Sequence, residues 1–413
     1  MSDEITKSAT LVMNEKVQAL EAAGRPVVNL GFGEAGLPVL PVLSSLAAAD
    51  LRRNEYPKVQ GSLAARSAVA GYFRRHGIGA DPGLCLIAPG SKAILYGLLR
   101  ALDGDVVLAR PSWVSYAAQA SLLGRRSIWV DVPAVAGGVP DPDLLPAALD
   151  KAIAEGARPR VMILTLPDNP TGTVAPAEVV RRLCAIAEKY DLAIISDEIY
   201  RGLAYDQDAF LSPAEVAPDR TFVTAGLSKS LALGGWRIGV ARFPQSELGE
   251  TTYRRFVAMA SEVWSGLAVF LEAVVEYVYA EPADVTERVA ASRRLHQAVS
   301  TEIWRILSAG GAEVRKPAGG FYLYPSFVGT PLASSLGATT DVELAERLLD
   351  EHGIAAIPGS SFGDDPSRLA LRVVTSMVYG TGDAQRLATL HAADPLAAAP
   401  VVAGLGRLRS ALG

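Results

Sequence analysis

Residues 161–197, VMILTLPDNPTGTVAPAEVVRRLCAIAEKYDLAIISD, contain one complete strand–helix–strand unit. The runs Val161–Leu166 and Leu192–Ser196 are rich in Val, Ile and Leu and predict buried strands. Between them, Pro176–Tyr190 has the pattern of a helix. Two such strands joined by a helix are typical of parallel neighbours in a sheet, so this stretch predicts an α/β fold.

The same alternation continues on both sides of this unit. Further strands are predicted at Leu84–Ala88, Asp105–Ala109, Arg126–Asp131, Thr221–Ala225 and Trp236–Ala241. Further helices are predicted at Lys92–Leu102, Ser112–Leu123 and Asp141–Ala154. Because apolar strands alternate with helices, we expect a mostly parallel central sheet that is covered by helices on both faces.

The pattern changes after about residue 245. A long helical stretch is predicted to run to roughly Ala280, with Pro282 marking its end. Later segments mix helices with the strand-like runs Phe321–Pro325 and Leu369–Thr375, which indicates a smaller α+β domain. The last twenty residues, from about Ala393, are rich in Ala, Gly and Pro and leave both a final helix and a loose tail open.

Composition excludes several classes of function. The chain has 39 basic and 44 acidic residues, and a net charge of -5 provides no footprint for nucleic acid or an anionic membrane. No run reaches the ~18 apolar residues of a membrane span, and no signal peptide follows the polar segment Met1–Lys7. The only cysteines, Cys85 and Cys184, are expected to be reduced core thiols of a cytoplasmic protein. Four unclustered histidines make a metal site unexpected.

Polar motifs follow the predicted strands, where an α/β sheet presents its ligands. The first motif is Pro89-Gly90-Ser91-Lys92, between a strand and a helix. A Gly-Ser turn at a helix N-terminus offers free backbone N–H groups, a hydroxyl and the positive end of the helix dipole, which suit a phosphate. The alternative is an ordinary helix start with Ser91 as its N-cap.

Two further motifs follow the strands of the opening unit. The turn Asp168–Gly172 contains Asn169, whose amide can donate to a ring oxygen, although an ordinary turn would have the same composition. Asp197 lies where the next strand leaves the core, and a carboxylate there is costly to bury unless it meets a cation such as a protonated pyridine nitrogen. Tyr200 follows three residues later and can donate to a phenolic oxygen.

The fourth motif contains Ser228, Lys229 and Arg237. A lysine in a confined site can lose its proton and attack an aldehyde, and an arginine offers a rigid fork for phosphate. Taken alone, Lys229 could also be interpreted as a solvated lysine on the surface. The order is more specific, because Asp197 comes 28 residues after Asn169, Lys229 comes 32 after Asp197, and Arg237 comes eight after Lys229.

In these residues the chain resembles the class I/II aminotransferases, which are pyridoxal 5'-phosphate (PLP) enzymes of fold type I. The core runs that carry the resemblance are DNPTG, SDEIY and SKSLALGGWRIG. Outside the core the likeness continues in SATLVMNEK, LGFGEAG, YPKVQGSLAAR, PSWVSY, PAGGFYLYPSF, IPGSSFG and LALRVVTS. It covers roughly residues 5–390 and is closest in motif to the bacterial aspartate/prephenate aminotransferase-like subgroup. With it we expect a large PLP-binding domain over residues 42–285 and a small domain formed by residues 1–41 and 286–413.

The resemblance implies a role for each residue around the cofactor ring. Lys229 would hold PLP as a Schiff base, an aldimine, and later move the substrate α-proton. Asp197 would keep the pyridine nitrogen protonated, which makes the ring an electron sink. Asn169 and Tyr200 would donate hydrogen bonds to the ring oxygen. Trp113 would stack on the ring, although a core aromatic residue is its plain alternative.

The resemblance also implies the phosphate contacts. Gly90, Ser91, Ser228 and Arg237 would bind the phosphate from the same chain. Tyr56 would reach it from the neighbouring subunit, so the active unit is expected to be a homodimer with its sites at the subunit interface. The family often has Ser where this chain has Gly226, which removes one hydroxyl donor that Ser228 would replace.

The remaining positions concern the substrate. Arg372 would hold the substrate α-carboxylate bidentately, assisted by Asn169 and the Gly33 N–H. Lys92 occupies a position where the subgroup also has lysine and recognises an acidic distal group; a solvent-facing helix start or one more phosphate contact are the alternatives. Lys7 matches a second lysine position of the subgroup, without the usual intervening proline. The loop that contains Glu34–Gly36 reads GEAG over residues 33–36, where GEPD is usual.

The sequence leaves three functions to compare. The first is an aminotransferase that moves an amino group from a glutamate- or aspartate-like donor to a 2-oxo acid by a ping-pong mechanism. The second keeps PLP but carries out elimination, cyclisation or oxidation of an amino acid, because the fold alone does not decide the reaction. The third, a ligand-sensing domain of a transcription regulator, is disfavoured because the chain is acidic and the likeness begins almost at Met1.

Overall fold

The structure is a computed structural model that describes residues 9–412. Its centre is a seven-stranded sheet in the order β2-β8-β7-β6-β5-β3-β4. The strands are β2 (Cys85–Pro89), β3 (Asp105–Arg110), β4 (Ser127–Asp131), β5 (Pro159–Thr165), β6 (Ala193–Asp197), β7 (Thr221–Gly226) and β8 (Ile238–Arg242). Strand β8 is antiparallel to both of its neighbours, and the other adjacent pairs are parallel. The predicted mostly parallel sheet is therefore confirmed, and each predicted strand lies within two residues of an observed one.

Helices cover both faces of this sheet because successive strand side chains point to opposite sides. Ile195 of β6 packs on one side and Ile194 on the other. The helices on the first side are α4 (Ser91–Ala101), α5 (Val114–Leu122) and α10 (Glu247–Val263). The helices on the second side are α2 (Pro41–Ala49), α3 (Leu63–Arg75), α6 (Leu145–Ala154), α7 (Ala177–Lys189), α8 (Pro213–Val216) and α11 (Glu272–Tyr279).

The prediction of one long helix up to Ala280 is wrong, because this stretch contains two helices. Helix α10 ends at Val263, a short turn follows, and α11 begins at Glu272. Ser265 has a left-handed backbone with φ of +62°, which stops the helix. The next residue, Gly266, passes so close to another segment that a Cβ there would lie 2.9 Å from the carbonyl oxygen of Lys58. Pro282 then caps the start of α12 (Ala283–Ala309).

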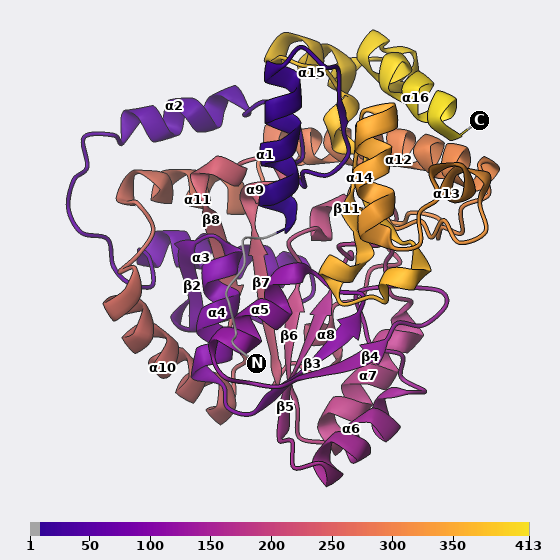
Figure 1. Ribbon diagram of the computed structural model, residues 1–413. Coiled ribbons are helices and arrows are strands. Elements are labelled where there is room, and N and C mark those ends of the chain that lie inside the picture. Colours follow the sequence, from indigo (N-terminus) through magenta and orange to yellow (C-terminus); the bar gives the residue numbers. More distant parts are fainter. Residues whose placement is uncertain (1–8, 413) are drawn as a thin grey trace.

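A second core combines residues from both ends of the chain. Val28, Leu30 and Leu37 pack with residues of α12 and of the helices α14 and α16. Figure 1 shows the late helices, in orange and yellow, gathered with α1 at one side of the central sheet. The helices here are α1 (Ala9–Ala22), α13 (Pro331–Leu336), α14 (Asp341–His352), α15 (Asp383–His391) and α16 (Ala399–Leu412). The domain boundaries at 41/42 and 285/286 stay a prediction, which this distribution of core residues supports.

Two small sheets accompany this second core. Strand β1 (Val28–Asn29) pairs in parallel with β10 (Ile354–Ala355). An antiparallel sheet consists of β11 (Ile357–Pro358), β12 (Leu371–Val374) and β9 (Tyr322–Leu323). The strands predicted at 321–325 and 369–375 are thus present but shorter.

The Ala/Gly/Pro-rich C-terminal segment is a helix over most of its length. Val401, Leu405, Leu408 and Ala411 of α16 are buried in the second core. Their spacing of three to four residues places them on one helix face. Packing of this face against the second core therefore stabilises the helix, although the segment is rich in Gly and Pro.

Three further observations on residues 9–412 concern membrane-spanning helices, metal sites and disulfides. No helix in that range has the length and apolarity needed to cross a membrane. No group of three or more His, Cys, Asp or Glu side chains there could hold a metal ion. Cys85 and Cys184 are both buried and unbonded, as expected for core thiols.

Candidate active site

A cavity of about 500 Å³ lies where the carboxyl ends of the central strands meet the second core. Most residues that the sequence predicted for the site line it, although their segments are far apart in the chain. These residues are Gly33, Ser91, Lys92, Trp113, Asn169, Asp197, Tyr200, Ser228, Lys229, Arg237 and Arg372. Parallel strands place their carboxyl ends at one edge, and this is why β5, β6 and β7 bring their following turns together.

Asp197, the last residue of β6, provides a buried carboxylate at the floor of the cavity. Its Oδ2 accepts a hydrogen bond from the Tyr116 hydroxyl at 2.7 Å, and its Oδ1 accepts one from the Thr224 hydroxyl at 3.1 Å. Burial raises the pKa of Asp197 to about 6, and the Tyr116 and Thr224 hydrogen bonds oppose that rise. Within the described part of the chain Asp197 forms no ion pair, so its carboxylate has room for a cationic partner.

The turn before α4 forms a cradle with Arg237. Gly90 has a left-handed φ of +88°, and a Cβ there would lie 2.3 Å from the Nη2 atom of Arg237. Only glycine therefore lets the guanidinium lie against the turn. Ser91, the first residue of α4, and Ser228 line the same cavity. Backbone N–H groups at a helix start, two hydroxyls and a guanidinium are a donor set for a phosphate.

Arg372 of β12 is a buried guanidinium that has no carboxylate partner among residues 9–412. Its Nη2 donates to the Gly31 carbonyl at 2.6 Å, and its Nη1 donates to Asn169 Oδ1 at 3.4 Å. Its Nε has no hydrogen-bond partner. Burial lowers the pKa of Arg372. The guanidinium lies 5.2 Å from the ring of Tyr322 and 5.1 Å from the ring of Phe362. An incompletely paired buried cation that faces the cavity is expected to take an anionic ligand.

Lys229 approaches the cavity from the short helix α9 (Leu227–Ser230). Its Nζ donates to the Gly33 carbonyl at 2.5 Å and lies 5.9 Å from the centroid of the Tyr200 ring. The side chain is half-buried, so its amine is confined but reachable from the cavity. An amine in this position can act as a nucleophile or move a proton.

The comparisons with known proteins identify the family. The model for class I and II aminotransferases matches residues 25–378. The chain belongs to this family. An aspartate aminotransferase of Geobacillus stearothermophilus is 30% identical over 384 residues, which cover 90% of this chain and 93% of that one. An aspartate/prephenate aminotransferase of Thermus thermophilus is 31% identical over 365 residues, covering 86% and 89%.

Solved structures agree with this assignment. The structure of aspartate aminotransferase from Thermus thermophilus with maleate superposes with a TM-score of 0.82 at 27% identity. It covers 98% of this chain and 97% of that chain. The protein is therefore a PLP-dependent aminotransferase of fold type I, and the predicted family, fold, cofactor and class of enzyme are confirmed. The alternative PLP reactions, elimination, cyclisation and oxidation, are not favoured.

The residues of this aminotransferase fit the cofactor. The uncompensated carboxylate of Asp197 suits a protonated ring nitrogen, and the cradle between Gly90 and Arg237 suits the phosphate. Lys229 lines the same cavity as these residues. A cavity of about 500 Å³ is within the range of small-molecule sites.

Lys92 and Trp113 lie together at the rim of the cavity. The Lys92 Nζ is 5.1 Å from the centroid of the Trp113 ring. Burial, reinforced by the charges of Arg237 and Lys229, lowers the pKa of Lys92. The side chain lines the cavity and does not point away from it, so its role toward substrate or phosphate stays a prediction. Lys7, its proposed companion, lies outside the described residues.

Tyr56 is not among the residues that line the cavity. Its side chain is 92% exposed in the single chain. The expectation that Tyr56 serves the neighbouring subunit remains a prediction.

Sequence reasoning missed three hydroxyls that complete the site. Tyr116 and Thr224 hold Asp197, and the hydroxyls of Tyr322 and Tyr200 are hydrogen-bonded at 2.8 Å. Tyr322 also donates to the Gly33 carbonyl at 3.5 Å. Tyr116 and Tyr322 lie within the family-like runs PSWVSY and PAGGFYLYPSF, which was the available signal. Their roles come from contacts between distant segments, which the runs alone do not specify.

Proposed function

We propose that this enzyme moves an amino group from an acidic amino acid to a 2-oxo acid in two half-reactions. The observation that carries the proposal is the buried guanidinium of Arg372, without a carboxylate partner, in the same cavity as Lys229. A substrate carboxylate would supply the missing charge and accept two parallel hydrogen bonds. The amino group of that substrate would then lie on the Lys229 side of the cavity.

Each polar side chain has a distinct task in this scheme. Bound PLP supplies an electron sink for negative charge at the substrate α-carbon. Asp197 holds a proton at the ring nitrogen and is itself oriented by Tyr116 and Thr224. Lys229 Nζ is the amine for the cofactor aldehyde and the group that moves the α-proton.

Two further residues position the ring and the substrate. The carbonyl oxygen of Asn169 accepts a hydrogen bond from Arg372. The NH2 group of the same side chain would donate to the ring oxygen of PLP. Burial holds the pKa of Tyr200 well above its usual value, so its hydroxyl stays protonated and able to donate.

The preference for an acidic donor rests on Lys92. Several relatives are named aspartate or aspartate/prephenate aminotransferases. Lys92 is a cation at the cavity rim that forms no ion pair within residues 9–412, and a second carboxylate on the substrate would pair with it. The contact is charge-assisted and exposed to water, so it discriminates modestly between acidic and neutral donors.

We further propose a homodimer in which Tyr56 completes the neighbouring phosphate site. Leu51 and Leu63, which flank Tyr56 in the sequence, are also exposed in the single chain, and exposed large apolar side chains favour a protein interface. The cytoplasmic location stays a prediction.

The experiment that tests the reaction uses holoenzyme and one amino acid at a time. Aspartate or glutamate alone should convert the bound cofactor to pyridoxamine phosphate and release one equivalent of 2-oxo acid, as seen in the absorbance of the cofactor. If no common amino acid gives this half-reaction, or if turnover continues without a 2-oxo acid acceptor, the proposal is wrong.

A further inference from the structure

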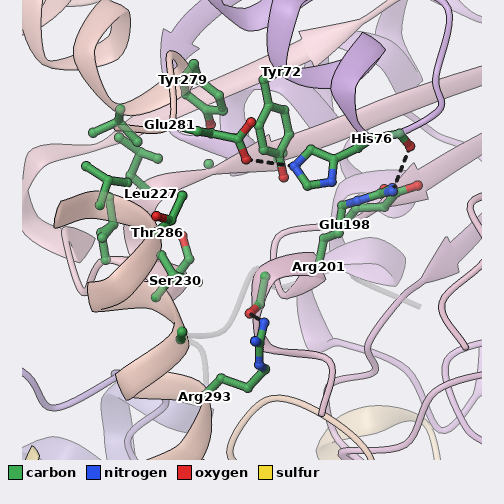
Figure 2. Close-up of a pocket in the computed structure, with 18 of the residues that line it drawn as sticks. Tyr72, His76, Glu198, Arg201, Leu227, Ser230, Tyr279, Glu281, Thr286 and Arg293 are labelled. Atoms are coloured by element: carbon green, nitrogen blue, oxygen red, sulfur yellow. Dashed lines mark hydrogen bonds and ion pairs between the residues drawn. The ribbon is translucent and has the colours of Figure 1, made fainter. Parts of the chain in front are cut away.

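A second cavity lies directly behind the turns that carry the catalytic residues. It has a volume of about 460 Å³, close to that of the catalytic cavity. Ile199, two residues after Asp197, lines both cavities and forms a shared wall. Leu227 and Ser230, which flank the catalytic turn of Lys229, also line the second cavity, as Figure 2 shows. The size is typical of sites that bind small molecules.

One end of this cavity offers two unpaired hydroxyls. The rings of Tyr72 and Tyr279 pack edge to face with centroids 5.2 Å apart. Neither hydroxyl has a hydrogen-bond partner among the residues that the structure describes. Burial raises the pKa of Tyr72 to about 12 and holds the pKa of Tyr279 well above its usual value, so both hydroxyls remain protonated donors.

Most charged side chains that line the cavity form ion pairs, and Arg293 is the cation among them that does not do so in the described part of the chain. Glu198 pairs with Arg201 at 2.7 Å, and Glu281 Oε2 pairs with Arg75 Nε at 2.7 Å. Arg293 forms no ion pair within residues 9–412, and its Nη1 reaches only the Gly202 carbonyl at 3.4 Å. Figure 2 shows Arg293 on the opposite side of the cavity from Tyr72 and Tyr279.

The remaining carboxylate of the lining, Glu287, does not neutralise Arg293. Its side chain is exposed to solvent, whereas Arg293 is half-buried. The half-buried guanidinium therefore remains available to an anion that enters the cavity.

Apolar side chains form the wall between these two ends. Leu227, Leu231, Val278 and Val285 are buried and line the cavity together with the half-buried Val289. Such a surface favours a flat or branched apolar body. The three parts of the cavity thus require an anion, an apolar body and a hydrogen-bond acceptor in that order.

We propose that this cavity binds a small arylalkanoate, with the carboxylate on Arg293 and a hydrogen-bond acceptor at the far end of the aromatic ring facing Tyr72 and Tyr279. The ligand contacts both segments that position the cofactor: Glu198 and Ile199 follow Asp197, and Leu227 lies two residues before Lys229. Its binding therefore changes the environment of the cofactor without blocking the substrate cavity.

The test is calorimetry with 3-(4-methoxyphenyl)propanoate and the holoenzyme. This probe has an aryl body, a carboxylate and a distal ether oxygen, but no amino or 2-oxo group to react. The wild-type enzyme and the Arg372→Lys variant should bind it with similar affinity. Arg293→Met should weaken binding about tenfold or more, because a charge-assisted hydrogen bond is lost. Arg294→Met, an exposed neighbour on the same helix, is the matched control and should bind as the wild type does.

Each contrary result overturns the proposal. Absence of binding to the wild type, or equal binding by the Arg293 and Arg294 variants, removes the site. Loss of binding in Arg372→Lys places the probe in the catalytic cavity instead. Because these readouts measure binding and not turnover, they are independent of the proposed transamination.

A second variant keeps the test valid if Arg293→Met does not fold. Val289→Phe places a larger side chain in the cavity and should abolish probe binding, while turnover without the probe is retained. Addition of the probe to wild-type enzyme should shift the cofactor absorbance, and this shift should be missing in Val289→Phe. Binding that survives in the filled cavity contradicts the proposal.

Discussion

The two sides of the catalytic cavity are specified in different ways. On the cofactor side, Lys229 and Arg237 lie eight residues apart in one segment, and Asp197 ends an adjacent strand. On the carboxylate side, Arg372 takes its partners from Gly31 and Asn169, which lie 341 and 203 residues away. The cofactor side is therefore determined largely by local sequence and strand order, and the carboxylate side by the packing of the second core against the sheet.

Replacing Lys229 tests the cofactor side and should have the largest effect. Lys229→Ala should lower the rate of transamination by about 10⁴-fold or more, because nucleophile and proton carrier are lost together. Steady-state kinetics measures the loss, and Lys316→Ala, an exposed lysine outside the cavity, is the control. Activity close to wild type in the Lys229 variant would contradict the assignment.

Replacing Arg372 tests the carboxylate side. Arg372→Leu should reduce kcat/KM for amino acids by about 10² to 10⁴, since two charge-assisted hydrogen bonds are lost. The loss should be smaller for an amine that lacks the α-carboxylate, because that substrate never used the guanidinium. An equal loss for both substrates would show that Arg372 acts on the fold and not on the carboxylate.

The pH dependence of cofactor-free protein tests the burial of Asp197. Its pKa is raised from 3.8 to about 6, so the folded state prefers the protonated carboxyl. Burial of the ionised carboxylate therefore lowers the free energy of unfolding. This loss is absent below pH 3.8, grows as the pH rises from 3.8 to 6, and reaches about 3 kcal/mol above pH 6. Asp197→Asn should be more stable relative to wild type at pH 8 than at pH 4. Urea unfolding at the two pH values measures this, and a difference of the opposite sign would refute it.

Removing the Tyr322 hydroxyl, which lies between the cofactor side and the carboxylate side of the cavity, should have the smallest effect. Tyr322→Phe loses the hydrogen bond between the Tyr322 and Tyr200 hydroxyls and the contact with Gly33, which costs about 1 kcal/mol or about fivefold in kcat/KM. Tyr324→Phe, whose hydroxyl donates to Asp364 outside the cavity, is the matched control. If both variants lose the same activity, the bridge between the two sides has no role in turnover.

The same contrast explains what could be predicted from sequence. The sheet, the turns after its strands and the polar residues within them follow from local patterns, and so Asn169, Asp197 and Lys229 were found. Tyr116 was missed because its contact with Asp197 spans 81 residues. The break at Ser265 was missed because the left-handed backbone there is not marked by its residue type, and the close approach of Gly266 to Lys58 joins segments that are far apart in the sequence. Tyr56 was predicted only from a family resemblance, because its proposed site lies on another subunit.

The second core has a consequence for the synthesis of the protein. Val28, Leu30 and Leu37 belong to a cluster that also contains Val401, Leu405 and Leu408. At roughly 5–20 residues per second, these early side chains emerge from the ribosome about 20 to 75 seconds before their last neighbours. The central sheet is complete once residue 242 has been made, whereas Arg372 of β12 is made 130 residues later. We therefore expect a nascent chain to acquire the elements that recognise the cofactor before it can recognise a substrate carboxylate.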